Sequence, residues 1–312
     1  MNYVKLGQRG PMVSVIGFGA WAIGGTDWGK TDDDVSKRAL HAALDEGVTL
    51  IDTADVYGFG HSEELIAEVL KERGGKKNII VATKAGNDFY RKKDDSKEYG
   101  PARQNYTKEY IIFAAEKSLK RLNVETLDIL QLHSGDTENL KKDEPWLALE
   151  QLKKDGKIRH AGWSVQSFKE TEQAFLLDEH RDLLDVIQVR YNLLEREAEK
   201  VLFPKAQKYG TGVIVRIPLL FGFLTGKFDE NTRFDKNDHR RMNLSPDKLK
   251  KYLEELKKLE SLYKKYPHYT KAQLALKFCI THPAAHTVIP GAKTPEQVKE
   301  NCKAATLKDV VF

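Results

Sequence analysis

Residues 49–64, TLIDTADVYGFGHSEE, place two side chains that could do chemistry close together in the sequence. Leu50 and Ile51 form a short apolar run bounded by turn residues, which predicts a buried strand that ends at Asp52. Tyr57 follows five residues later, in the loop after this strand. Because α/β folds keep their chemistry at the carboxyl ends of strands, Asp52 and Tyr57 are candidate catalytic residues. A carboxylate that caps local backbone and a tyrosine that fills a loop would produce the same pattern.

Other apolar runs also end in a polar residue, and these ends stand at Lys84, His133, Ser164, Gln188 and Arg216. A buried lysine or aspartate is costly unless it is paired, so Lys84 and Asp52 on neighbouring strands are expected to form an ion pair. The Lys84 ammonium beside Tyr57 would favour phenolate and lower the tyrosine pKa. With His133 across the same mouth, these residues would supply a proton donor and a carbonyl-orienting group, as carbonyl reduction requires.

Each of these polar residues also has an ordinary structural interpretation. Lys84 could be solvated at the start of a loop, and His133 could hydrogen-bond within its own loop. Ser164 and Gln188 could satisfy backbone groups at the strand ends. Their joint occurrence at successive strand ends favours a functional site over these separate interpretations.

The elements that would position these residues alternate between strand and helix about eight times. The expected strands cover residues 16–21, 50–52, 79–84, 127–133, a run that ends at 164, 186–189, 212–216 and 287–290. The expected helices begin at the N-cap residues Thr31 and Ser62 and cover 108–122, a segment that ends at 156, 170–177, 197–209 and a segment from 295. The strands are apolar on both faces, which is typical of a parallel sheet covered by helices. The count and the length favour a closed (β/α)8 barrel, the TIM barrel, over a doubly wound sheet.

Two additions extend this α/β barrel. Residues 4–6 and 13–15, joined by the turn QRGP, predict an N-terminal β-hairpin. Residues 245–281 hold two extra helical patterns, and the first is capped by Ser245 and carries apolar residues at helical spacing as far as Tyr263. No break in composition marks a boundary, so residues 1–312 are expected to form a single domain.

The composition restricts the partners that we expect. The chain has 312 residues, 40% of them hydrophobic and 31% charged, which is enough for a full core. Its 51 basic and 46 acidic residues give a net charge of +5, so neither nucleic acid nor an anionic membrane is an expected partner. Cys279 and Cys302 have neither metal-site spacing nor a disulfide framework, which favours a cytoplasmic location. Residues 1–5 lack a signal-peptide core, no apolar run approaches a membrane span, and a monomer is the default expectation.

The glycines near the start do not predict a Rossmann turn, and no metal motif occurs in the sequence. Residues 17–22, GFGAWA, fit the loose dinucleotide pattern GxGxxA after a strand. A helix should begin there at once, but Gly24, Gly25 and Thr26 intervene, and Asp52 lies too far along the chain to bind a ribose. We interpret the segment as a loop at the barrel mouth.

These motifs, in this order over nearly the whole chain, resemble the aldo-keto reductase superfamily, and in particular its bacterial reductases and potassium-channel β subunits. Residues 52–58, DTADVYG, with 61–63 resemble the first signature of that family, and residues 118–133 resemble the second. Residues 224–227, LTGK, and 289–301, IPGAKTPEQVKEN, resemble its cofactor-binding part. The resemblance implies a (β/α)8 barrel that binds NADP(H) across its mouth and transfers a hydride between nicotinamide C4 and a carbonyl carbon.

The resemblance also implies a role for each residue. Tyr57 would be the general acid, Lys84 and Asp52 would tune it, and His133 would orient the carbonyl oxygen. Trp21, Tyr57 and His133 would contact the substrate, and Lys293 would meet a 2′-phosphate, which favours NADPH over NADH. The implied cofactor-binding residues are Ala20, Trp21, Asp52, Ser164, Gln188, Arg216, Pro218, Leu219, Phe221, Lys227, Gly291, Lys293, Gln297, Glu300 and Asn301.

Two positions depart from the family pattern. Val165 follows Ser164 where asparagine or arginine is usual, so one polar contact to the nicotinamide is lost. Arg216 stands where an aromatic ring usually stacks on the nicotinamide. A guanidinium plane can also stack, or it could reach the pyrophosphate or an acidic substrate.

Three function hypotheses follow, and the first is an NADPH-dependent aldehyde or ketone reductase. The second is a non-catalytic nucleotide-sensing subunit like the channel β proteins, which lack histidine at the position of His133. The third is a barrel lyase with Lys84 as a Schiff-base amine, which requires a neutral lysine, whereas a partner at Asp52 would keep it charged. The substrate is not identified, and its specificity is expected to lie in loops 21–28, 87–104 and 219–243.

Overall fold

The barrel predicted from the sequence is present in the structure, a computed structural model that describes residues 1–29, 31–90 and 103–312. Within these residues, eight parallel strands pair in the order β12-β11-β10-β9-β8-β5-β4-β3. Parallel bridges from Ile16 to Val288 and from Gly19 to Gly291 close the sheet. The strands are β3 (Phe18–Gly19), β4 (Leu50–Asp52), β5 (Ile80–Ala85), β8 (Leu127–His133), β9 (Ile158–Ser164), β10 (Leu184–Arg190), β11 (Gly212–Arg216) and β12 (Thr287–Val288).

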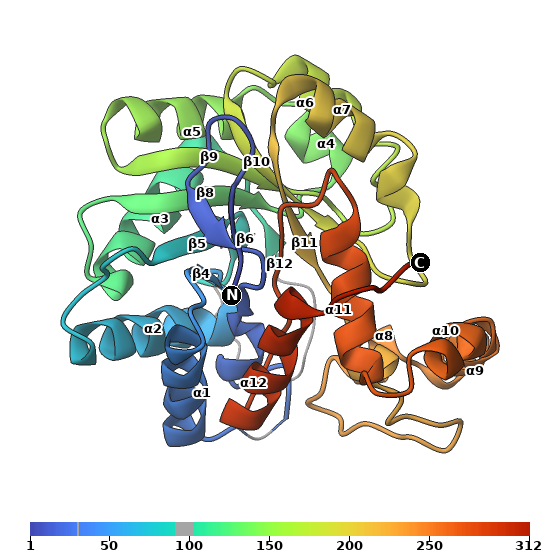
Figure 1. The fold of residues 1–312 in the computed structure, drawn as a ribbon. Helices are drawn as coiled ribbons and strands as arrows, with labels where there is room; N and C mark the ends of the chain where they lie inside the picture. Colours follow the sequence, from blue (N-terminus) through green and yellow to red (C-terminus); the bar gives the residue numbers. More distant parts are fainter. Residues whose placement is uncertain (30, 91–102) are drawn as a thin grey trace.

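Helices surround the strands on the outside, as Figure 1 shows. They are α1 (Asp33–Asp45), α2 (His61–Glu72), α3 (Lys108–Leu122), α4 (Thr137–Leu140), α5 (Glu144–Lys154), α6 (Phe175–Glu179), α7 (Leu202–Tyr209), α8 (Arg240–Asn243), α11 (Lys271–Thr281) and α12 (Pro295–Lys303). The extra helices α9 (Pro246–Lys257) and α10 (Glu260–Lys265) lie to one side of the barrel. The short 3-10 helices are η1 (Ala20–Ile23), η2 (Tyr57–Gly60), η3 (Glu197–Glu199), η4 (Leu220–Thr225) and η5 (Ala304–Thr306).

The predicted N-terminal hairpin is present as β1 (Tyr3–Lys5) and β2 (Met12–Ser14), which pair antiparallel. Its buried side chains Leu6 and Val13 pack into a layer of core residues from the barrel strands. That layer consists of Leu50, Ala82, Ile129, Val186, Ile214 and Ile289. The hairpin therefore fills the barrel interior away from the carboxyl ends of the strands, and those ends are left for the site.

Several predicted bounds were wrong for local reasons. Asp32 rather than Thr31 caps α1, because its carboxylate accepts the N–H of the third helical residue at 2.9 Å. The first predicted strand, 16–21, is reduced to β3, since the chain turns into η1 at Ala20. β12 stops before residue 290, where Pro290 has no N–H for the sheet ladder. The helices predicted at 170–177, 197–209 and 246–263 are α6, η3 with α7, and α9 with α10.

Ser62 does not cap α2 as the sequence predicted. The helix begins at His61 after the left-handed Gly60, so Ser62 lies in its first turn. The buried Ser62 hydroxyl donates to the carbonyl oxygen of Ala20 at 3.0 Å and lies 2.9 Å from the hydroxyl of Thr53. This serine therefore ties together the loops that follow β3 and β4.

The small antiparallel pair β6 (Asn87–Asp88) and β7 (Arg103–Gln104) was not predicted. It frames the expected specificity loop 87–104, of which residues 91–102 lie outside the described residues.

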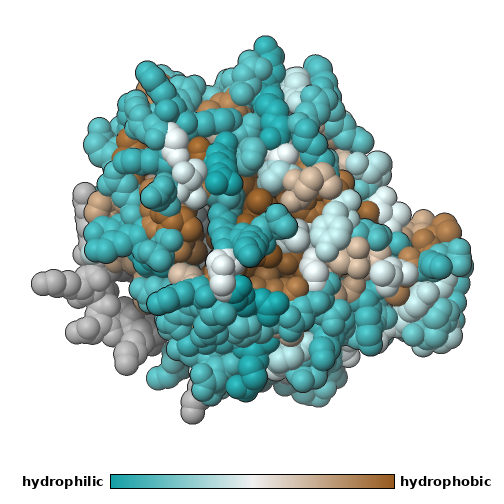
Figure 2. All heavy atoms as spheres, turned by 60° about the vertical axis from the view of Figure 1, so that its left-hand side comes forward, coloured by the Kyte–Doolittle hydropathy of each residue, from teal (hydrophilic) through white to brown (hydrophobic). Residues whose placement is uncertain are grey.

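On the face drawn in Figure 2, hydrophilic side chains cover most of the surface and hydrophobic residues show between them. In the described ranges, no helix has the length and hydropathy needed to cross a membrane.

Candidate active site

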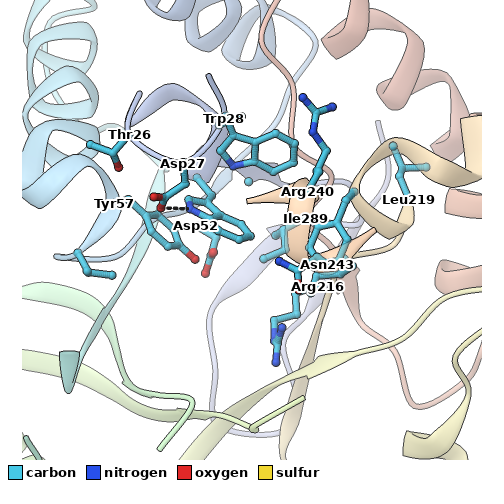
Figure 3. A pocket seen from close by; sticks show the side chains of 18 of the residues that line it. Thr26, Asp27, Trp28, Asp52, Tyr57, Arg216, Leu219, Arg240, Asn243 and Ile289 are labelled. Atoms are coloured by element: carbon cyan, nitrogen blue, oxygen red, sulfur yellow. Dashed lines mark hydrogen bonds between the residues drawn. The ribbon is translucent and has the colours of Figure 1, made fainter. Parts of the chain in front are cut away.

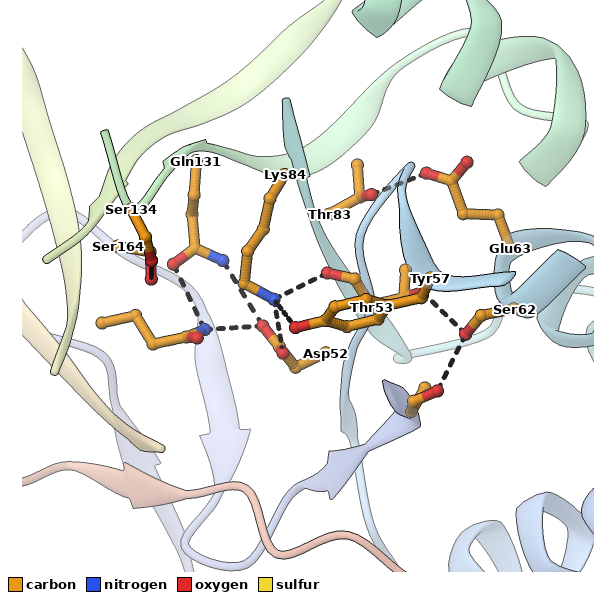
Figure 4. Close-up of polar contacts among 12 residues, drawn as sticks. Asp52, Thr53, Tyr57, Ser62, Glu63, Thr83, Lys84, Gln131, Ser134 and Ser164 are labelled. Atoms are coloured by element: carbon orange, nitrogen blue, oxygen red, sulfur yellow. Dashed lines mark hydrogen bonds and ion pairs between the residues drawn. The ribbon is translucent and has the colours of Figure 1, made fainter. Parts of the chain in front are cut away.

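The ammonium of Lys84 lies at the centre of a buried polar network where β4 and β5 end (Figure 4). Its Nζ donates to Asp52 Oδ2 at 2.7 Å, to the carbonyl oxygen of Thr53 at 2.8 Å and to Tyr57 Oη at 3.4 Å. Lys84 is 1% exposed and Asp52 is 3% exposed. The ion pair predicted from the sequence is therefore formed, with the phenol within hydrogen-bonding reach of the cation.

Two glutamines complete the coordination of Asp52. Gln188 Nε2 donates to Asp52 Oδ1 at 2.6 Å and to Gln131 Oε1 at 3.3 Å. Gln131 Nε2 donates to the same Asp52 oxygen at 3.4 Å. Sequence reasoning missed Gln131, although it is a polar residue inside the apolar run of β8 and points to the same side as His133, two residues later. Both carboxylate oxygens are thus satisfied, as a buried carboxylate requires.

The electrostatics of Tyr57 differ from the prediction. Burial raises the pKa of Tyr57, the Lys84 ammonium lowers it, and the Asp52 carboxylate raises it, so that the pKa stays above its ordinary value. The predicted net lowering was therefore wrong, because burial outweighs the nearby cation. Burial lowers the pKa of Lys84, but the opposing effects of Asp52 and Tyr57 are larger, so the pKa is raised overall and the lysine stays charged. The site thus holds a protonated phenol beside an ammonium.

The loop that carries Tyr57 is fixed by close backbone packing. Gly58 has a φ of +63°, and a Cβ there would lie 2.1 Å from the carbonyl oxygen of Gly24, so only glycine fits. The Trp21 ring stacks on the Tyr57 ring with centroids 5.8 Å apart, and its indole N–H donates to Asp27 Oδ2 at 3.0 Å. Figure 3 shows Asp27 close to Tyr57 at one end of the cavity. The phenol is therefore held from the backbone side and from one ring face.

His133 lies beside Tyr57 with the two ring centroids 5.8 Å apart and nearly perpendicular. Burial lowers the pKa of His133 well below its ordinary value, and Lys84 and Arg216 lower it further, so the imidazole is neutral near pH 7. Its Nδ1 is buried without a hydrogen-bond partner among the described residues. Because His133 lines the cavity described below, its neutral imidazole can donate one ring N–H to a ligand there.

A cavity of about 1700 Å³ opens above this network. Most of the site residues predicted from the sequence line it, namely Trp21, Asp52, Tyr57, His133, Ser164, Gln188, Arg216, Pro218, Leu219, Phe221, Lys227, Gly291, Lys293 and Gln297. Lys84 lies beneath the lining and Ala20 is buried behind it. Glu300 and Asn301 do not line it either, and the Glu300 carboxylate already accepts hydrogen bonds from Thr270 and Gln273 at the start of α11.

Arg216 is a cation without an acidic partner in hydrogen-bonding contact, so far as the described residues show. Its Nη2 donates to the carbonyl oxygen of Val165 at 2.8 Å and to Ser167 Oγ at 3.0 Å. Burial lowers the pKa of Arg216 to about 10, and the neighbouring Arg190 lowers it too. The two positions that depart from the family pattern therefore contact each other, since the backbone of Val165 holds the guanidinium.

Three cations lie along another part of the cavity: Lys227 after η4, Arg240 in α8 and Lys293 after β12. Burial and the charge of Arg240 lower the pKa of both lysines, although Arg240 is itself paired with the Asp238 carboxylate, which raises the pKa of Lys293. Lys293 Nζ donates to the carbonyl oxygen of Trp28 at 2.6 Å. Sequence reasoning missed Arg240, although the basic run at 239–241 falls in an expected specificity loop. Such a cluster suits a polyanionic ligand.

Comparisons with known proteins identify the family. A model described as the aldo/keto reductase family matches residues 15–311. Aldo-keto reductase YhdN of Bacillus subtilis is 34% identical over 303 residues, which cover 96% of this chain and 87% of YhdN. A candidate voltage-gated potassium channel subunit beta of Schizosaccharomyces pombe is 31% identical over 317 residues, which cover 97% of this chain and 88% of that protein. The structure of glycerol dehydrogenase AKR11B4 from Gluconobacter oxydans matches with a TM-score of 0.81 and 34% identity, covering 99% of this chain and 91% of that chain.

The chain therefore belongs to the aldo/keto reductase family, and the predicted resemblance is confirmed. Family membership supports an oxidoreductase that uses a nicotinamide cofactor and acts on small carbonyl compounds.

Removing the Lys84 ammonium tests how much its ion pair with Asp52 contributes to the free energy of unfolding. In Lys84→Met, the Asp52 carboxylate stays buried without its counter-charge, so the free energy of unfolding should fall by about 3–5 kcal/mol. The double variant Asp52→Asn/Lys84→Met leaves no buried charge and should regain about half of that loss or more. Urea unfolding measures both, and Lys141→Met, which breaks an exposed pair with Glu138, should cost under about 1 kcal/mol. Equal losses in the single and double variants would contradict this interpretation of the pair.

Proposed function

We propose that this protein is an NADP(H)-dependent oxidoreductase that reduces aldehydes and ketones to alcohols by hydride transfer. The observation that carries the proposal is the Lys84–Tyr57 contact at 3.4 Å below an open cavity, beside a neutral His133. A protonated phenol and a neutral imidazole can both donate to one carbonyl oxygen. The cations Lys227, Arg240 and Lys293 that line another part of the same cavity fit the phosphates of a dinucleotide.

In the proposed reaction, Tyr57 donates its proton to the carbonyl oxygen as negative charge develops there. Lys84, held in place by Asp52, then stabilises the phenolate that Tyr57 becomes. His133 donates an N–H to the same oxygen and orients the carbonyl group. When bound, the nicotinamide cofactor supplies the hydride.

The residues that we propose for the cofactor fall into two groups. Ser164 and Gln188 would hold the carboxamide, since the Gln188 amide nitrogen is occupied by Asp52 and Gln131 while its oxygen is left to accept. Lys227 and the backbone of residues 218–221 would meet the pyrophosphate, and Lys293 with Gln297 and Gly291 would meet the adenosine half. We propose NADPH over NADH because Lys293 could pair with a 2′-phosphate. Ala20, Glu300 and Asn301 do not line the cavity, and we assign them no contact.

The two other hypotheses fit the site less well. A nucleotide-sensing subunit, suggested by the similarity to the potassium channel subunit beta, would have no need of the His133–Tyr57 arrangement. A Schiff-base lyase needs a neutral lysine in contact with substrate, whereas Lys84 is charged, bonded to Asp52 and beneath the cavity lining.

Removing the phenol hydroxyl tests the proposed acid. Tyr57→Phe should lower kcat by about 10²–10⁴-fold, because general-acid catalysis contributes that much. The Kd for NADPH, measured by fluorescence titration, should stay within about twofold, since the ring and its stacking on Trp21 remain. Tyr209→Phe, which removes a hydroxyl that bonds Asp178 outside the site, is the matched control. Full turnover in Tyr57→Phe would refute the assignment.

Cofactor preference should depend on Lys293. Lys293→Ala should raise the Kd for NADPH about tenfold and leave that for NADH nearly unchanged, since only NADPH carries the 2′-phosphate. Lys299→Ala, on the same helix α12 but away from the cavity lining, is the control. Isothermal titration calorimetry gives all the constants, and an equal loss for both dinucleotides would show that Lys293 does not meet the 2′-phosphate.

A further inference from the structure

Two phenylalanines at the mouth of the cavity stand out because they are both exposed and strained. Phe59 is 62% exposed and Phe168 is 65% exposed, and both line the cavity. Both also adopt left-handed backbone conformations, with φ of +57° and +65°. A bulky residue with positive φ costs free energy, and an exposed aromatic ring gains little from burial in return. Strain of this kind persists at sites where it serves binding or catalysis.

The two rings are held in place by their neighbours. The Arg190 guanidinium lies 4.5 Å from the Phe168 ring centroid, and Glu195 fixes that guanidinium through two hydrogen bonds of 2.5 and 2.6 Å. The Phe59 ring lies 5.7 Å from the ring of Phe89, which also lines the cavity. Each ring is therefore supported by a contact and still largely exposed, which is the state of a binding surface without its ligand.

The strand order divides the mouth of the barrel into two arcs. The loops after β4, β5 and β9 carry Phe59, Phe89 and Phe168, and β8, which lies between β5 and β9 in the sheet, ends at His133. The segments after β11 and β12 carry the cations Lys227, Lys236, Arg240 and Lys293, together with the Phe221 ring and the Asp238 carboxylate that pairs with Arg240. Anionic phosphates belong to the cationic arc, and the aromatic arc borders the groups proposed to hold the carbonyl oxygen.

We propose that Phe59 and Phe168 are specificity-determining residues that receive an uncharged aromatic group of the carbonyl substrate. The substrate class is then an aromatic aldehyde or ketone rather than a small polyol-derived carbonyl compound. This inference rests on the proposed function, since it extends the carbonyl site between Tyr57 and His133. The rings would pack against the aromatic group of the substrate in offset or edge-to-face contact.

Asparagine substitution separates binding from folding, because asparagine tolerates left-handed backbone far better than phenylalanine. Phe59→Asn and Phe168→Asn should each raise the KM for benzaldehyde about fivefold, in line with the loss of one aromatic contact. The double variant should raise it further, while kcat and the KM for glyceraldehyde stay within about twofold. The melting temperature of Phe59→Asn should be unchanged or higher, since strain is relieved. Phe312→Asn, at an exposed phenylalanine that does not line the cavity, is the matched control.

The outcomes separate this inference from the proposed function. Unchanged benzaldehyde kinetics in the double variant, an equal rise in KM for glyceraldehyde, or a wild type that prefers glyceraldehyde would each overturn the inference. A lower melting temperature in Phe59→Asn with unchanged KM would show that this ring serves folding. If the wild type reduces no carbonyl compound with NADPH or NADH, the proposed function fails instead.

Discussion

The ion pair between Lys84 and Asp52 is the interaction on which the rest of the site depends. Taking both charges out of water is expensive, so the pair persists only because its remaining polar atoms are satisfied. The three ammonium protons have acceptors in Asp52, Thr53 and Tyr57, and the carboxylate accepts from Gln131 and Gln188 as well. Of these partners, Tyr57 is the one that presents a reactive hydroxyl to the cavity. The barrel brings all of these residues together, because successive parallel strands end at one mouth.

The sequence was informative wherever a polar residue ended an apolar run. Asp52, Lys84 and His133 were found in this way, since burying a polar or charged side chain costs free energy unless it is paired or hydrogen-bonded. Residues in less conspicuous settings were missed: Gln131 lies inside a strand, and Ser62 looks like an ordinary helix cap although it bridges two loops. The engagement of Glu300 by α11 depends on a contact between distant segments, which no local pattern reveals. The direction of the Tyr57 pKa shift was mispredicted because burial depends on the packed surroundings, including Trp21.

The mouth of the barrel carries most of its lining lysines on the segments after β11 and β12 and two exposed phenylalanine rings on the loops after β4 and β9. Arg240 is paired with Asp238, whereas burial and the Arg240 charge lower the pKa of Lys227 and Lys293, so a bound polyanion would favour the charged form of both lysines. Phe59 and Phe168 are likewise unfavourable on their own, with strained backbone and exposed rings. Both regions therefore store free energy that a suitable ligand would release, and the two ligands would meet at Tyr57. Arg216 lies between these functions, held by the Val165 carbonyl, where it adds positive charge to the inner end of the cavity.

The central claim is that burial holds the Tyr57 pKa above its ordinary value while Lys84 favours the ionised form. Carbon-13 NMR of ring-labelled tyrosines, with Tyr57 assigned by its loss in Tyr57→Phe, measures this titration directly. The account predicts a Tyr57 pKa above the ordinary value of 10.0 in the wild type and a higher one in folded Lys84→Met, where the cation no longer stabilises the phenolate. A Tyr57 pKa at or below 10.0, or one that does not change in Lys84→Met, would contradict it.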